Sequence, residues 1–159
     1  MLEISNLNFK QNCYPNFKGK FKIDEPKKFM ANYISAGEIA QNVCEQGLEV
    51  IFDKMAKGTS RKVVGTVKPE IMQAGGEMRK IRYTLSVTYP AIDKKTFDKI
   101  NRTDTFLKTI SYDPYVPDEA DIKGKMEEFC NGICKKISDS ERDVKFGMKK
   151  FKYFSRIFK

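Results

Sequence analysis

Residues 78–90 read MRKIRYTLSVTYP, the clearest structural signal in the chain. Apolar and polar side chains alternate strictly through this stretch. A period of two places one set on each face of a β-strand and predicts a strand with one buried and one wet face. The buried set is Ile81, Tyr83, Leu85, Val87 and Tyr89, and the wet set is Lys80, Arg82, Thr84, Ser86 and Thr88.

The preceding stretch, 61–73, predicts the partner strand of an antiparallel hairpin. Gly75-Gly76 separates the two strands and supplies turn residues. Pro69 lacks an amide donor, so we expect it at a sheet edge or a bulge.

Two helices are expected on either side of this hairpin. Ser35 and Glu38 have the spacing of a capping box, and the following apolar residues predict a helix over 36–57 that Gly58 ends. Asp118 is placed to cap a second helix, although Asn131-Gly132 lowers its helix propensity. The apolar stripe of that helix is Ile122, Met126, Phe129, Cys130, Ile133 and Ile137.

Three weaker patterns complete the expected order. Residues 2–23 predict two short strands or an extended arm, 93–100 predict two helical turns capped by Asp93, and 105–113 predict a strand that ends at Asp113-Pro114. The expected fold is α+β: a small antiparallel sheet flanked by two helices, with an extended N-terminal arm and a basic aromatic C-terminal segment. We expect a single domain over 1–159, divided into an arm (1–30), a helix-sheet-helix core (31–141) and a tail (142–159).

The chain has 159 residues and a formal net charge of +9. Residues 142–159 hold seven of the cations against Asp143 alone, so the basic character is assigned mainly to this tail. Such a charge suggests an acidic partner, although solubility and Lys-rich codon usage explain it equally well. Eight apolar side chains between 144 and 158 are too many for a solvated tail, so we expect this segment to be ordered.

Several classes of function lack their residues here. The chain has no His, which excludes Ser-His and Cys-His catalysis and the usual zinc hydrolase motifs. Neither a GxxxxGK[ST] loop nor a GxGxxG motif is present. We therefore expect a non-enzymatic protein with no cofactor and no metal.

The N-terminus and the cysteines indicate the compartment. MLEISNLNFKQN has no apolar core, so no signal peptide is expected, and no apolar run is long enough to span a membrane. In a reducing compartment the cysteines would be free thiols. Cys130 and Cys134 would then lie on one helix face, and buried thiols are favoured there over a metal site.

Part of the chain resembles the small tail proteins of tailed bacteriophages. The resemblance covers roughly 61–117 and rests on RKIRYTLSVTYP, on IDKKTFDKI and on the turn Tyr112-Asp113-Pro114-Tyr115. The two predicted helices make tail terminator or tail-completion subunits the more similar group. The resemblance implies a structural virion protein that forms a ring through lateral contacts with its own copies and with other assembly proteins. The implied location is the virion or the host cytoplasm.

Two other interpretations stay open. The order helix, three strands, helix is also similar to the lipopolysaccharide-assembly lipoproteins, which bind an acidic lipid but carry a signal peptide and a lipidated Cys. The basic tail could instead bind nucleic acid or an acidic protein surface, because it combines positive charge with stacking surfaces. We favour packing of its aromatics on the core or on a neighbouring subunit. The candidate interaction residues are Lys145, Phe146, Lys149, Lys150, Phe151, Lys152, Tyr153, Phe154, Arg156 and Phe158.

Overall fold

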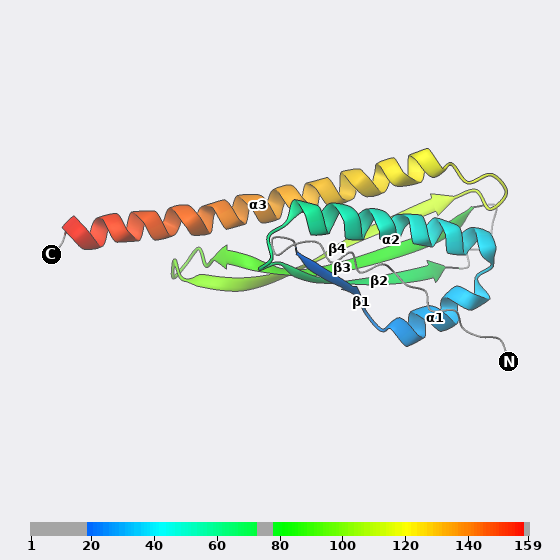
Figure 1. Cartoon of the computed structure of the whole chain (residues 1–159), viewed down its shortest axis with the longest axis horizontal. Coiled ribbons are helices and arrows are strands. Elements are labelled where there is room, and N and C mark those ends of the chain that lie inside the picture. Colours follow the sequence, from blue (N-terminus) through cyan, green and yellow to red (C-terminus); the bar gives the residue numbers. More distant parts are fainter. Residues whose placement is uncertain (1–18, 73–77, 158–159) are drawn as a thin grey trace.

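The structure is a computed structural model that describes residues 19–72 and 78–157, with side chains described as far as Gly147. Two long helices lie over one face of a sheet (Figure 1). The elements in chain order are β1 (Lys20–Ile23), α1 (Pro26–Ser35), α2 (Glu38–Gly58), β2 (Val64–Met72), β3 (Arg79–Ile92), β4 (Lys99–Tyr112) and α3 (Glu119–Ile157). This arrangement confirms the predicted α+β class.

The sheet has four strands in the order β1-β2-β3-β4. β2 and β3 form the predicted antiparallel hairpin, and β4 pairs antiparallel with β3 over its whole length. The prediction of a purely antiparallel sheet is wrong, because β1 runs parallel to β2. The chain between these two strands contains α1 and α2, which gives it the length that a parallel connection requires.

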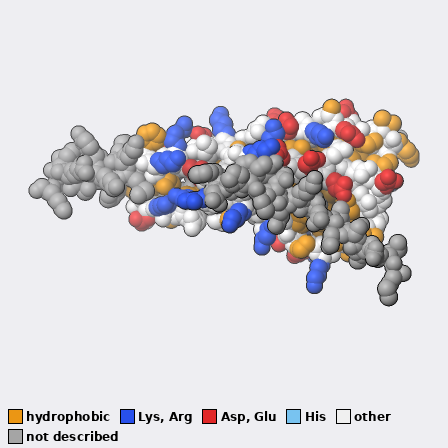
Figure 2. All heavy atoms as spheres, viewed as in Figure 1, with side chains coloured by type: hydrophobic (Ala, Val, Ile, Leu, Met, Phe, Trp, Pro, Cys, Tyr) orange, Lys and Arg blue, Asp and Glu red, His pale blue; other side chains and the backbone are white. Residues whose placement is uncertain are grey.

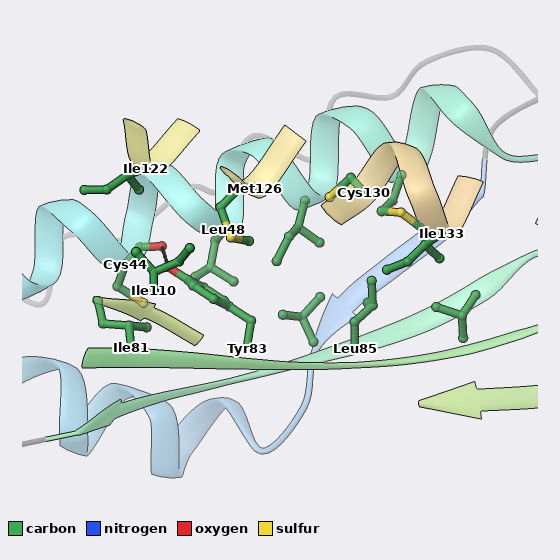
Figure 3. Packing of buried hydrophobic residues seen from close by; sticks show 14 of the residues in the cluster. Cys44, Leu48, Ile81, Tyr83, Leu85, Ile110, Ile122, Met126, Cys130 and Ile133 are labelled. Carbon is green, nitrogen blue, oxygen red and sulfur yellow. Dashed lines mark hydrogen bonds between the residues drawn. The ribbon is translucent and has the colours of Figure 1, made fainter. Parts of the chain in front are cut away.

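The core lies between the sheet and the helices α2 and α3. The five apolar residues predicted to face inward from β3 are all buried, as expected from the alternation in 78–90. Tyr83 reaches furthest, and its hydroxyl donates a hydrogen bond to the Cys44 carbonyl of α2 at 3.2 Å (Figure 3). Val43 and Ile51 of α2 are buried in the same cluster, and Phe52 packs at its margin.

The helix α2 matches the prediction for 36–57, but its caps differ from those expected. Ser35 is the last residue of α1, and its Oγ donates to the carbonyls of Ala31 and Asn32 instead of capping α2. The N-cap of α2 is Gly37, with φ of 84° and no side-chain cap. The capping-box prediction is therefore wrong, because the hydroxyl is used by the preceding helix.

At its other end, α2 includes Gly58 as its last residue, and the reason for glycine there is close packing. A Cβ on Gly58 would lie 2.5 Å from the Cys134 Sγ of α3. The next residue, Thr59, satisfies the helix end through a bond of 2.6 Å from its Oγ1 to the Met55 carbonyl.

The helix α3 is longer than predicted. Asp118 caps it as expected, with Oδ1 accepting from the Asp121 amide at 3.0 Å. The predicted stripe faces the core, with Phe129 at its margin. The helix continues to Ile157 and is 39 residues long in all, so 142–157 belongs to it and is not a separate tail. Gly132 does not interrupt the helix. It lies on the solvent side, where a Cβ built on it would have no neighbour within 4 Å.

The predicted arm over 1–30 is partly replaced by regular structure. Residues 1–18 lie outside the described part, whereas 20–23 form β1 and 26 begins α1. The sequence analysis missed α1. Pro26 occupies its first position, where a missing amide costs nothing, and Phe29 and Tyr33 anchor it in the core.

Pro69 lies at a sheet edge, as expected. β1 pairs with β2 only as far as Val67, and beyond this point α1 contacts β2. Pro69 keeps its place opposite Tyr83 in an unbroken register with β3, so no bulge forms. Pro69 has no amide hydrogen to donate, and the edge of β2 at this residue therefore lies next to α1 and not next to a strand.

The predicted helical turns at 93–100 are wrong. Residues 93–98 form a tight turn, and β4 begins at Lys99, six residues before the predicted strand 105–113. Asp93 does cap this turn, since its Oδ1 accepts from the amides of Lys95 at 2.7 Å and Thr96 at 3.1 Å. A second bond of 2.8 Å, from the Asp93 amide to the Asp98 carbonyl, closes the hairpin.

Candidate assembly surface

The strand β4 forms one edge of the sheet. Its 14 residues pair with β3 on one side, and no strand within the described ranges pairs with the other side. At about 3.4 Å per residue this edge is roughly 45 Å long. An unpaired edge presents backbone donors and acceptors in a row, which makes it a template for a strand of another chain.

Apolar side chains accompany this edge. Leu107 is 64% exposed, on the sheet face that the helices leave open, and Ile100 is 38% exposed. The half of the strand that contains Leu107 reads TFLKTISY, with Lys108 as its one charge. Residues of this kind favour strand pairing, whereas natural edges are usually protected by several charges.

One carboxylate on β4, Asp104, faces toward α3. Its Oδ2 accepts from the Tyr89 hydroxyl at 2.7 Å and lies 2.7 Å from the Lys136 ammonium of α3. Its Oδ1 accepts from the Arg102 Nε at 3.0 Å. The hydrogen bond and charge of Lys136, with the bonds from Tyr89 and Arg102, hold the pKa of Asp104 well below its usual range.

This network neutralises the charge on the edge and attaches α3 to it. Burial, reinforced by the bond to Asp104, raises the pKa of Tyr89 to about 12, so the phenol stays protonated. The Lys136 ammonium also lies 5.1 Å from the centre of the Phe106 ring on β4. Asp104 is thus not a free charge that would repel an approaching strand.

The turn before β4 carries an unusual aromatic residue. Phe97 is 71% exposed and has φ of 60°, in the left-handed region that bulky side chains rarely adopt. Such conformations cost of order 1–3 kcal/mol and cluster at functional positions. This exposed phenylalanine closes the turn, with its amide donating to the Asp93 carbonyl at 2.8 Å, and it lies next to the start of the β4 edge.

All of the predicted interaction residues except Phe158 lie on the C-terminal part of α3, which extends beyond the sheet (Figure 1). Lys145 and Phe146 are exposed, the latter by 61%. The backbone of 149–156 is helical, and Phe158 lies outside the described residues. Helical backbone from 144 to 157 is the order expected for this segment, although its aromatic contacts remain a prediction.

The thiols and carboxylates of the described residues form no further candidate site. Cys44 and Cys130 are buried free thiols, and burial raises the pKa of each to about 12. Cys134 is a half-buried free thiol, and Cys13 lies outside the described ranges. Among the described residues, no three His, Cys, Asp or Glu side chains gather closely enough to hold a metal ion. None of the described helices is long and apolar enough to cross a membrane.

Sequence reasoning missed the first half of β4 and therefore the length of the edge. Between 99 and 104 the alternation is obscured, because Arg102 and Asp104 occupy the helix-facing positions. These charges are tolerated there because they pair with each other and with Lys136. Of the helix-facing positions from 100 to 106, only Ile100 and Phe106 are apolar, which is too weak a signal to predict a strand.

Comparison of the chain with protein-family models, curated proteins and solved structures finds no match.

Proposed function

We propose that this protein is a non-enzymatic assembly protein that joins other subunits through the free edge of β4. The observation that carries the proposal is the combination of a 14-residue strand, whose outer edge no described strand pairs with, and an exposed Leu107. A second copy of the chain supplies the simplest partner strand. Pairing two β4 strands about a twofold axis gives an isologous contact and one continuous sheet of eight strands.

Charge favours one register for this contact. If the twofold axis passes beside Phe106, a residue that precedes Phe106 in one strand lies opposite the residue that follows Phe106 by the same number of positions in the partner strand. Lys108 then faces Asp104 of the partner subunit, and Leu107 faces Thr105 of the partner subunit. A shift that placed the axis beside Thr105 would bring Lys108 opposite Arg102 of the partner subunit. Like charges directly opposite destabilise a sheet, so the Phe106 register is preferred.

Light scattering on the purified chain tests the proposal. Leu107→Lys introduces two like charges per dimer close to the twofold axis, and we expect the dimer dissociation constant to rise at least about tenfold, or ~1.4 kcal/mol. Ile34→Lys is the matched control, since Ile34 is 70% exposed on α1, away from β4. A chain that is monomeric at all accessible concentrations would exclude the self-assembly proposal.

The register has its own test. Lys108→Glu places a carboxylate opposite Asp104 of the partner subunit and should weaken the dimer, whereas Lys108→Arg should preserve it. Equal dimer stability in both variants would mean that β4 pairs in another register or with another strand.

The tail proteins of bacteriophages are the particular setting that the sequence resemblance suggests. In that setting the protein would be present in a fixed copy number in purified tail particles. Mass spectrometry of such particles, with and without the Leu107→Lys variant, tests it. Particles that assemble normally without the protein would contradict a structural role there.

Anionic-ligand binding by the C-terminal part of α3 is the second candidate function. The observation in its favour is that Lys145 and Phe146 are both exposed on this helix. Neutralising Lys145, Lys149 and Lys150 should then abolish binding to anionic ligands while the β4 contact persists.

A further inference from the structure

The face of the sheet opposite α2 and α3 is a second basic region, distinct from the C-terminal segment. Alternation turns five cations of β1, β2 and β3 toward this open face, where Glu70 is the one carboxylate on the same strands. We call this set the cationic face; its cations are Lys20, Lys22, Lys68, Lys80 and Arg82. In the view of Figure 2, Lys and Arg side chains lie along both the lower and the upper side of the molecule.

This face accounts for the positive excess of the described core. The remaining Lys and Arg side chains of 19–72 and 78–147 are nearly balanced by Asp and Glu. The cations are also available. Lys20, Lys22 and Lys80 are exposed and make no ion pair with any described side chain, whereas Lys68 pairs with Glu25 and Glu70, and Arg82 pairs with Glu70.

Hydroxyl groups fill the space between these cations and the β4 edge. Thr66, Thr84, Ser86 and Thr88 lie on the open face of β2 and β3, and β4 adds its own threonines. Two cross-strand pairs link them, Ser86 to Thr105 at 3.2 Å and Thr88 to Thr103 at 2.8 Å. Lys, Arg, Ser and Thr are the side chains that hydrogen-bond to phosphate oxygens in nucleic-acid complexes.

We infer that the cationic face binds the phosphate backbone of double-stranded nucleic acid without reading its sequence. Interfaces with DNA are polar and strongly positive, as this face is, whereas the centre of a protein interface is depleted of charge. On the described strands no aromatic side chain lies on this face, so bases of a single strand would have no stacking surface. Leu107 stands among threonines and offers little apolar area for insertion into a membrane.

Fluorescence anisotropy with a short labelled DNA duplex tests the inference. If each cation contacts one phosphate, log K should fall with log salt with a slope of about −4 to −5. Lys22→Gln with Lys80→Gln should reduce the slope by about two and weaken binding roughly tenfold or more, equally for unrelated duplex sequences. The matched control is Lys123→Gln with Lys135→Gln, two exposed lysines on α3 whose loss should matter much less.

Three results would overturn the inference. The first is equal loss of affinity in the two double variants, which would indicate net charge alone. The second is loss only when Lys149 and Lys150 are neutralised, which would assign binding to the C-terminal part of α3. The third is tighter binding to anionic phospholipid vesicles or to single-stranded oligonucleotide than to the duplex. Lys108→Glu separates this inference from the β4 proposal, because Lys108 shares the helix-facing side of the sheet with Tyr83; the change should weaken self-assembly without altering the cationic face.

Discussion

Gly47→Ala tests the closest contact between α2 and the sheet. Gly47 lies directly over Tyr83, and both are buried. A Cβ built on Gly47 would lie 2.1 Å from the Tyr83 Oη and 2.5 Å from its Cζ. These separations are far below van der Waals contact, and the tyrosine hydroxyl is held against α2 by its bond to Cys44. Either the ring or the helix must move to accept the methyl group.

The expected magnitude follows from three opposing effects. Replacing glycine by alanine inside a helix gains about 1 kcal/mol of propensity. Forcing a methyl group into a filled core costs about 1–3 kcal/mol, and losing the Tyr83 hydrogen bond costs about 1 kcal/mol more. The sum is a net destabilisation of about 1–3 kcal/mol.

Urea unfolding of a double-mutant cycle measures this contact. Tyr83→Phe removes the nearest atom but leaves the ring carbon, so Gly47→Ala should cost less in that background, by about 0.5 kcal/mol or more. Gly132→Ala is the control, because nothing lies within 4 Å of its Cβ position and it should stabilise the protein by about 0.5–1 kcal/mol. If Gly47→Ala also stabilises the protein, α2 does not pack over Tyr83 and the reasoning is refuted.

Four further outcomes are expected. Leu85→Ala should lower the free energy of unfolding by about 2–5 kcal/mol, because Leu85 is completely buried; an unchanged melting temperature would mean the register is wrong. Phe97→Gly should raise the free energy of unfolding by up to about 1 kcal/mol by relieving the positive φ; a loss would show that the ring is packed. The pKa of Asp104 is lowered in the folded state, so its contribution is present above the unfolded pKa, near 3.9, and is lost as pH falls below it. The stability difference between wild type and Asp104→Asn should therefore shrink on acidification below about pH 4, whereas a constant difference would exclude the ion network. Cys134 should react with a thiol reagent faster than Cys44 in the native state, because Cys44 is fully buried and burial raises its pKa to about 12; equal rates would contradict this packing.

The parts of the fold that could be predicted are those where one face of an element is covered and the other is wet. Residues 78–90 show this alternation because α2 and α3 cover only one side of β3. The stripe from Ile122 to Ile137 is similarly clear, since α3 rests on the sheet along one face. In both elements, the residues that the periodicity places on one face are the residues that are buried.

Short elements were harder to predict, because they take their stability from neighbours. β1 has four residues and is recognisable only from its pairing with 64–67, which no local pattern reveals. Ser35 could cap the helix that follows it or bond back to the helix that precedes it. Local spacing does not distinguish these uses, and the burial of Phe29 and Tyr33, which stabilises α1, decides between them.

The cationic face could not be predicted from the sequence, because the charges were counted along the chain. Counting charges along the chain assigned the basic character to 142–159, because seven cations and one carboxylate fall within these eighteen residues. The cations of the cationic face come from three separate stretches of the sequence, and they share one face only when β1, β2 and β3 pair. They are Lys20 and Lys22, Lys68, and Lys80 and Arg82. Counting along the chain cannot detect a surface built from every second residue of three strands.

The register also explains how five cations share one face without strong repulsion. Lys20 lies opposite Val64 and Lys22 opposite Thr66, while Lys80 lies opposite Met72 and Arg82 opposite Glu70. Lys68 lies opposite Thr84. No cation of the face is therefore directly opposite another across β1, β2 and β3, the arrangement that would be destabilising. Residual repulsion acts over longer distances, is screened by salt, and is relieved when an anionic backbone binds, which is why the salt dependence of binding is the decisive measurement.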